Sequence, residues 1–273
     1  MASLASPLAP LLTELQVEQL EELFWCRRSS FGLLRGFHFS NSMFGSASQE
    51  KAYFTPFAVF LGFLALNGFV GNLFDGLASP WWKSDPRFWV FPLQTLVCGG
   101  LLARWWRQYD FKLPSLPAIG LAGGVGVLVL ALWIAPQVWL GFPARQEGFD
   151  PTYFGNSGWA FGLTVALRFL RLAIVVPLVE EIFWRGYLLR TLIAEPFTRV
   201  PIGAFSWLSF GVVTAGFCLE HQPADYPAAL LTGALYNLVA YRTHSLSACV
   251  LAHAVTNLLL GIFVMRTGQW GFW

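Results

Sequence analysis

Charged residues are scarce in this sequence. Of its 273 residues only 12% are charged, with 17 basic against 15 acidic side chains, whereas 56% are hydrophobic. A soluble domain usually carries about 25% charged residues, so these few charges cannot coat a water-exposed surface of this size. The formal net charge of +2 is also too small to indicate a nucleic-acid-binding protein. Lipid must therefore act as the solvent for much of the surface.

Cysteine is equally rare, and its positions form no C-x-x-C pair. Cys26, Cys98, Cys218 and Cys249 are scattered along the chain. Their spacing excludes a disulfide framework and a zinc ribbon. We interpret them as small buried apolar residues.

Long apolar runs dominate the chain beyond residue 50. About 20 residues cross the hydrocarbon core of a bilayer, and backbone groups in lipid must hydrogen-bond within their own segment, so each run predicts a helix. The runs lie at about 53–75, 88–105, 116–140, 160–182, 202–219, 225–241 and 246–265. The sequence thus predicts an all-α, polytopic transmembrane bundle of about seven (roughly six to eight) helices.

Residues 1–50 have a different composition. They mix Ser, Pro and charges with one amphipathic stretch, Leu12–Trp25, which is of the kind that lies on a membrane surface. We predict an N-terminal extension over 1–50 and the bundle over 51–273. The connections after the second, fourth and sixth runs are richer in Lys and Arg than the others, which favours a cytoplasmic N-terminus.

Polar residues inside the later runs point to function, because an ionisable group at membrane depth is costly. In the fourth run Glu180 and Glu181 are adjacent, and Arg185 follows four residues after Glu181. Residues four apart share a helix face, so Glu181 and Arg185 suit an ion pair. Glu180 points about 100° away and is left to face a cavity. A plain ion pair at the end of a helix is the alternative.

Two further constellations follow on later runs. Phe217 and His221 are four apart, and so are His253 and Asn257 deep in the final run. The alternatives are an interfacial turn for the first pair and hydrogen bonding between helices for the second.

Together these residues could perform hydrolysis. A carboxylate and a His can activate water as a general base, and a second His with an Asn can donate to a developing oxyanion. A zinc site made by Glu180, His221 and His253 is a competing interpretation, since one carboxylate and two imidazoles form a plausible ligand set. A transporter or binding protein could also line a substrate site with the same cluster.

The ordered motifs E-E-x-x-x-R, F-x-x-x-H and H-x-x-x-N resemble the CAAX prenyl protease and bacteriocin-processing family. This is the Abi or type II CAAX endopeptidase family of intramembrane proteases, and the resemblance covers about 160–265. The tail, with Ala252 to Asn257 and a closing Thr267-Gly268-Gln269-Trp270, resembles the bacterial CAAX-protease-related branch found with exosortase sorting systems.

The resemblance implies a role for each matching residue. Glu180 would activate the water with His221 as its partner, and His253 and Asn257 would form the oxyanion site. This scheme needs no cofactor; a zinc-dependent mechanism would use Glu180, His221 and His253 as ligands.

Glu181, Arg185 and Phe217 would support these groups. The implied substrate is a peptide or protein of the cell membrane, in a bacterium the inner membrane, and the branch implies a link to a protein-sorting system. Non-catalytic scaffold or immunity proteins are a further possibility within the family. The Gly155-Asn156-Ser157-Gly158 sequence matches the G-x-S-G of rhomboid proteases, but it lies in a polar loop and is interpreted as a turn.

Overall fold

Helices make up most of the described part of the chain. The computed structural model describes residues 42–74, 80–143 and 148–273, with side chains from residue 48 onward, and no strand occurs among them. The described residues from Phe44 on belong to one compact unit, Phe44–Trp273. The all-α prediction is therefore confirmed, whereas the predicted surface helix at Leu12–Trp25 lies outside the described residues.

Each predicted run coincides with a helix. The long helices are α2 (Ser42–Phe74), α4 (Arg87–Arg104), α5 (Leu116–Val138), α6 (Gly158–Leu170), α9 (Trp207–Leu219), α10 (Tyr226–Thr243) and α11 (Leu246–Thr267). The short α3 (Trp81–Ser84), α7 (Val176–Glu181) and α8 (Leu189–Thr191) complete the α-helices of the described residues. Serine side chains begin three of the long helices: Ser115, Ser206 and Ser245 each accept a hydrogen bond from the backbone three residues on.

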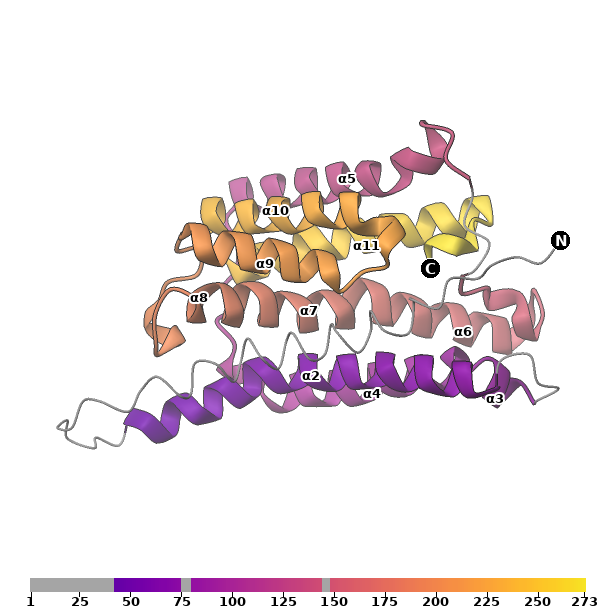
Figure 1. Cartoon of the computed structure of the whole chain (residues 1–273), viewed down its shortest axis with the longest axis horizontal. Helices are drawn as coiled ribbons and strands as arrows, with labels where there is room; N and C mark the ends of the chain where they lie inside the picture. The colour runs from indigo at the N-terminus through magenta and orange to yellow at the C-terminus, as the bar shows by residue number, and fades with distance from the viewer. Residues whose placement is uncertain (1–41, 75–79, 144–147) are drawn as a thin grey trace, which may run out of the picture. The chain divides into compact units, whose positions relative to one another are not determined.

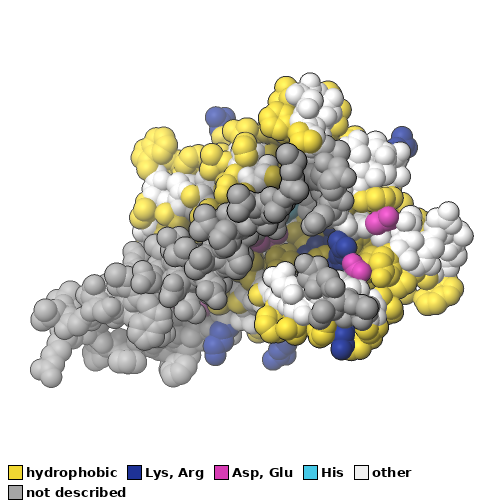
Figure 2. All heavy atoms as spheres, turned by 45° about the vertical axis from the view of Figure 1, so that its right-hand side comes forward, with side chains coloured by type: hydrophobic (Ala, Val, Ile, Leu, Met, Phe, Trp, Pro, Cys, Tyr) yellow, Lys and Arg dark blue, Asp and Glu magenta, His cyan; other side chains and the backbone are white. Residues whose placement is uncertain are grey.

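Four helices of the described chain are long and apolar enough to cross a membrane. They are Ser48–Phe74, Leu116–Val138, Gly158–Thr191 and Leu246–Thr267, and Trp207–Leu219 is a shorter apolar helix. Large hydrophobic side chains stay exposed, among them Phe69 at 67% and Leu96 at 64%. Figure 2 shows hydrophobic side chains over much of the face that it draws, with few charges among them. These features are those of a membrane protein.

The fourth predicted run is longer in the structure. It was expected to end near residue 182, but α6, α7 and α8 form one continuous helix to Thr191, interrupted by two π-helical segments, η3 (Arg171–Val175) and η4 (Ile182–Leu188). The arginines that suggested a membrane edge are satisfied internally. Arg190, for example, donates to the carbonyls of Val200 (2.7 Å), Gly186 (3.1 Å) and Thr198 (3.3 Å).

This long helix lies in the middle of the bundle (Figure 1). It contacts α4 on one side and α9 and α11 on the other. Phe57 of α2 stacks on Phe183 of η4 with ring centroids 3.9 Å apart. Every polar residue singled out on the fourth run therefore lies where several helices converge.

The closest helix packing is between α5 and α11, and it depends on Gly126. A Cβ at this position would lie 2.7 Å from the Ala252 carbonyl oxygen and 2.8 Å from Val255 Cγ1. The Gly126 carbonyl also accepts a hydrogen bond from Thr256 Oγ1 at 2.9 Å. Glycine thus lets α5 approach the helix that carries His253.

We expect the Gly126→Ala substitution to lower the thermal unfolding midpoint of the detergent-purified protein. The new methyl group must push α5 and α11 apart, a kind of overpacking that costs about 1–3 kcal/mol. The control is Gly124→Ala on the same helix, where a Cβ would meet nothing within 4 Å. Helix propensity alone would stabilise both variants by about 1 kcal/mol, so equal midpoints for the two variants would contradict this account.

Candidate active site

The centre of the site is a fully buried ion pair. Arg185 Nη1 donates to Glu181 Oε1 at 3.0 Å, and neither side chain has any exposed surface. The pair joins α7 to η4 across one helical turn, as the four-residue spacing predicted. Its complete burial shows that it is not the interfacial helix-end pair that was the alternative.

Arg185 also ties the central helix to α10. Its Nε donates to Asn237 Oδ1 and its Nη2 to the Gly233 carbonyl, both at 3.0 Å. Asn237 in turn donates to Thr214 Oγ1 of α9 at 3.1 Å. The Phe217 ring lies 5.0 Å from the guanidinium, a cation–π contact. All three guanidinium nitrogens are satisfied, which a buried charge requires.

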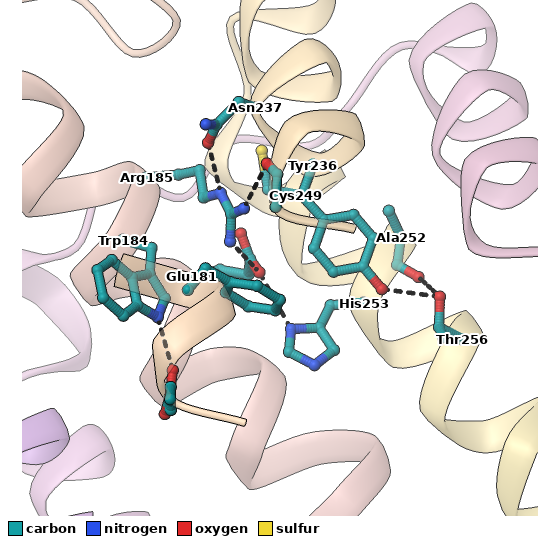
Figure 3. Close-up of polar contacts among 12 residues, drawn as sticks. Glu181, Trp184, Arg185, Tyr236, Asn237, Cys249, Ala252, His253 and Thr256 are labelled. Carbon is teal, nitrogen blue, oxygen red and sulfur yellow. Dashed lines mark hydrogen bonds and ion pairs between the residues drawn. The ribbon is translucent and has the colours of Figure 1, made fainter. Parts of the chain in front are cut away.

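His253 brings α11 to the same carboxylate. Its Nδ1 lies 3.0 Å from Glu181 Oε1, so one carboxylate oxygen accepts from both Arg185 and His253 (Figure 3). A carboxylate held by an arginine acts as an acceptor, so Nδ1 carries the proton and Nε2 is left for another partner. The sequence assigned Glu181 to Arg185 alone and did not foresee its contact with His253.

Asn257 lies one turn further along α11. Its Nδ2 donates to the Leu172 carbonyl of η3 at 2.9 Å. A π-helical segment alters the backbone hydrogen-bond pattern, and such segments are frequent at functional sites. Here the segment offers a carbonyl to a side chain of another helix, which fixes Asn257 close to the face that bears His253.

Glu180 is buried beside this network without a full set of partners. It is 5% exposed, and within the described residues its Oε2 has no hydrogen-bond partner. Its carboxyl interacts electrostatically with those of Glu181 and Glu220, and with the guanidinium groups of Arg185 and Arg171. This is the group that the sequence left free to face a cavity.

Glu220 was not given a role by sequence reasoning. It ends α9, and its Oε2 accepts from Trp184 Nε1 of η4 at 3.0 Å, while its Oε1 has no partner among the described residues. Its only signal in the sequence was its position directly before His221. The structure adds this carboxyl to the surroundings of Glu180.

His221 follows α9, with its Nδ1 2.8 Å from the Phe217 carbonyl oxygen. A carbonyl only accepts, so Nδ1 is the donor and a neutral His221 has its lone pair on Nε2. The Phe217 ring lies 4.9 Å from the His221 ring and 6.3 Å from that of His253. Phe217 therefore packs against both histidines, although no hydrogen bond within the described part joins His221 to Glu180.

A metal site is the alternative that the sequence left open. Among residues 42–74, 80–143 and 148–273, no group of three or more His, Cys, Asp or Glu is placed to hold a metal ion. The zinc alternative with Glu180, His221 and His253 as ligands stays a prediction. Ser157, the candidate rhomboid-type nucleophile, is an exposed residue that precedes α6.

We expect Arg185→Lys to destabilise the protein strongly. A lysine keeps the charge but cannot reach the Glu181, Asn237 and Gly233 acceptors together, which leaves buried polar groups unpaired at a cost of about 3–5 kcal/mol. Thermal unfolding in detergent measures the effect. The matched control is Arg199→Lys, since Arg199 is exposed. Equal unfolding midpoints for the two variants would show that the hydrogen bonds of Arg185 do not stabilise the bundle.

Comparison with known proteins supports the resemblance seen in the motifs. The family described as type II CAAX prenyl endopeptidase Rce1-like matches residues 162–259. That region contains the Glu180–Glu181 pair, His221, His253 and Asn257. Comparison with curated proteins gave no match, and neither did comparison with solved structures. The match supports a relationship of residues 162–259 to the CAAX protease family, and these residues lie within a bundle that has four helices long and apolar enough to cross a membrane among its described residues.

Proposed function

We propose that this protein hydrolyses a peptide bond of a membrane-associated peptide or protein, with Glu180 as the group that activates water. The observation that carries the proposal is a buried glutamate whose Oε2 has no hydrogen-bond partner among the described residues, beside Glu181, whose Oε1 is held by Arg185 and His253. A general base needs a free oxygen within hydrogen-bond reach of water. Glu181 is less suited to this role, because the Arg185 cation stabilises its charged form through Oε1, although its Oε2 also lacks a partner among the described residues.

In both histidines a protein partner engages Nδ1, which leaves Nε2 for the reaction. In His221 the Nδ1 contact with Phe217 leaves a lone pair on Nε2, which can accept from the same water as Glu180. In His253 the Nδ1 contact with Glu181 holds the ring, and when the ring carries both protons its Nε2–H can donate to an oxyanion. Glu181 and Arg185 thus act as positioning residues.

Asn257 provides a second donor for the oxyanion. Its amide carries two N–H groups, and the Leu172 carbonyl occupies one of them. The other is available to a carbonyl oxygen of the substrate. Two preorganised donors at such a position stabilise the charge that develops in the transition state.

The reaction balances with these groups alone. Glu180 takes a proton from water, and the hydroxide oxygen bonds to the carbonyl carbon while the carbonyl π electrons move to oxygen, next to His253 and Asn257. The C–N bond then breaks, and Glu180 returns the proton to the leaving amine. We further propose a bacterial inner-membrane location with a cytoplasmic N-terminus and a substrate drawn from an exosortase-type sorting system, both from the sequence alone.

We expect Glu180→Gln and His253→Ala each to reduce peptide cleavage by about 100-fold or more, because each removes a group that acts in the transition state. Reconstituted protein is tested on a panel of fluorogenic membrane peptides, with and without a lipid group. Glu50→Gln, a change outside the site, is the control and keeps the wild-type rate. Equal rates for all variants would refute the assignment, and a wild type that binds peptides without cleaving them would indicate a scaffold.

We expect chelation to leave the cleavage rate unchanged. The protein is treated with a strong zinc chelator, dialysed and assayed on the same peptides with and without added Zn²⁺. The proposed proton transfers need no metal-bound water. A rate that falls with the chelator and returns with Zn²⁺ would show that a metal, rather than Glu180, activates the water.

A further inference from the structure

A cavity that carries two arginines lies apart from the proposed active site. It has a volume of about 110 Å³ and lies between α4 and the α6–η3 stretch of the central helix. Its walls are mainly apolar and include Phe88, Phe91 and Leu163, while Arg168 and Arg171 supply its charge.

Arg168 is buried with donors that nothing accepts. It is 6% exposed, and within the described residues its Nε and Nη1 have no hydrogen-bond partner. Its guanidinium carbon lies 4.6 Å from the centre of the Phe149 ring, 5.5 Å from Phe91 and 5.7 Å from Trp273. These rings stabilise the cation through its flat faces. They leave the N–H groups in its plane unpaired, which is unfavourable for a buried charge.

Arg171 adds a second charge, which forms no salt bridge with a carboxylate of the described residues. Its Nε donates to Gln94 Oε1 at 2.8 Å, and Gln94 Nε2 donates to the Phe60 carbonyl at 2.8 Å, which fixes the amide with its oxygen toward the arginine. Glu180 acts on Arg171 at longer range without forming a salt bridge. The nearby Arg87 has its own partner, Asp85, at 2.9 Å.

The arginines of the central helix differ in how many hydrogen-bond acceptors the protein gives them, and this difference points to a ligand that binds in the cavity. Arg185 has an acceptor for each of its nitrogens, whereas Arg168 and Arg171, one turn apart, share a cavity and lack a carboxylate among the described residues. Two guanidiniums offer the forked donors that match the oxygens of a phosphate group.

We propose that this cavity binds a phosphate group, carried by an anionic phospholipid that enters from the bilayer. Leu163, at the wall of the cavity, is 50% exposed and lies within the candidate membrane span Gly158–Thr191, so the cavity borders a surface that lipid covers. Basic pockets between transmembrane helices are suited to acidic head groups. The cavity does not overlap the proposed hydrolytic site, because Arg168 is about 18 Å along the helix from Glu180 at 1.5 Å per residue; Arg171 interacts with Glu180 only electrostatically.

Native mass spectrometry of the detergent-purified full chain tests the site. The wild type is mixed with equal amounts of phosphatidylglycerol, which is anionic, and phosphatidylcholine, which is neutral overall. We expect it to retain about tenfold more of the anionic lipid than of the neutral one. Arg168→Gln removes the unpaired charge and is expected to abolish the preference. The matched control Arg107→Gln removes an exposed arginine and is expected to keep the preference for the anionic lipid. That result would exclude a general attraction of basic residues to acidic lipid.

A second variant guards against a folding defect in the first. Leu163→Trp narrows the cavity wall and keeps both arginines, so it too is expected to lose the retained lipid while its unfolding midpoint stays near that of the wild type. A separate arm adds inorganic phosphate without lipid: protection of the wild type but not of Arg168→Gln would assign the phosphate site to a free anion. Equal lipid retention by the wild type and both cavity variants, with no protection by phosphate, would overturn the proposal.

Discussion

One carboxylate oxygen, Oε1 of Glu181, organises the second half of this protein. It accepts from Arg185 on its own helix and from His253 on α11, both at 3.0 Å. A buried ion pair is stable only when every remaining donor is also satisfied. Arg185 meets this requirement by reaching Asn237 and Gly233 on α10. The charge inside the bundle therefore fixes how α10 and α11 approach the central helix.

The same arrangement gives the two adjacent glutamates different surroundings. Glu181 accepts two hydrogen bonds through its Oε1, while Glu180 is turned about 100° around the helix, and its buried Oε2 has no hydrogen-bond partner among the described residues. Glu181 Oε2 also lacks such a partner, so the two carboxylates differ in the donors that hold Glu181 Oε1. The π-helical segments on both sides of α7 add to this, because one of them supplies the carbonyl that holds Asn257.

Aromatic rings partly replace water as the environment of the buried arginine side chains, through cation–π contacts. Phe217 lies 5.0 Å from the Arg185 guanidinium and contacts both histidine rings, and Phe91 lies 4.4 Å from that of Arg171. The arginines at the two ends of the central helix differ in the hydrogen-bond acceptors that surround them. Around Arg185 the protein provides the acceptors, whereas around Arg168 the described residues provide ring faces only, so an acceptor must come from outside them.

Patterns in the sequence were sufficient to predict the helical elements of the fold and most residue types of the candidate site. Apolar length predicted each helical run, because lipid forces the backbone to bond within its own segment. The four-residue spacing of Glu181 and Arg185 predicted their ion pair, since that contact is local to one helix. The order of three motifs was enough for the family resemblance.

The contacts between helices could not be predicted in this way. Arg185 meets Asn237 across 52 positions, Arg171 meets Gln94 across 77, and Glu181 meets His253 across 72. No periodicity of the sequence encodes such distances, because they depend on how helices pack. The continuation of the fourth run to Thr191 was missed for a different reason. Its arginines resemble a membrane boundary until the segment after the helix offers the carbonyls of Thr198 and Val200 to Arg190.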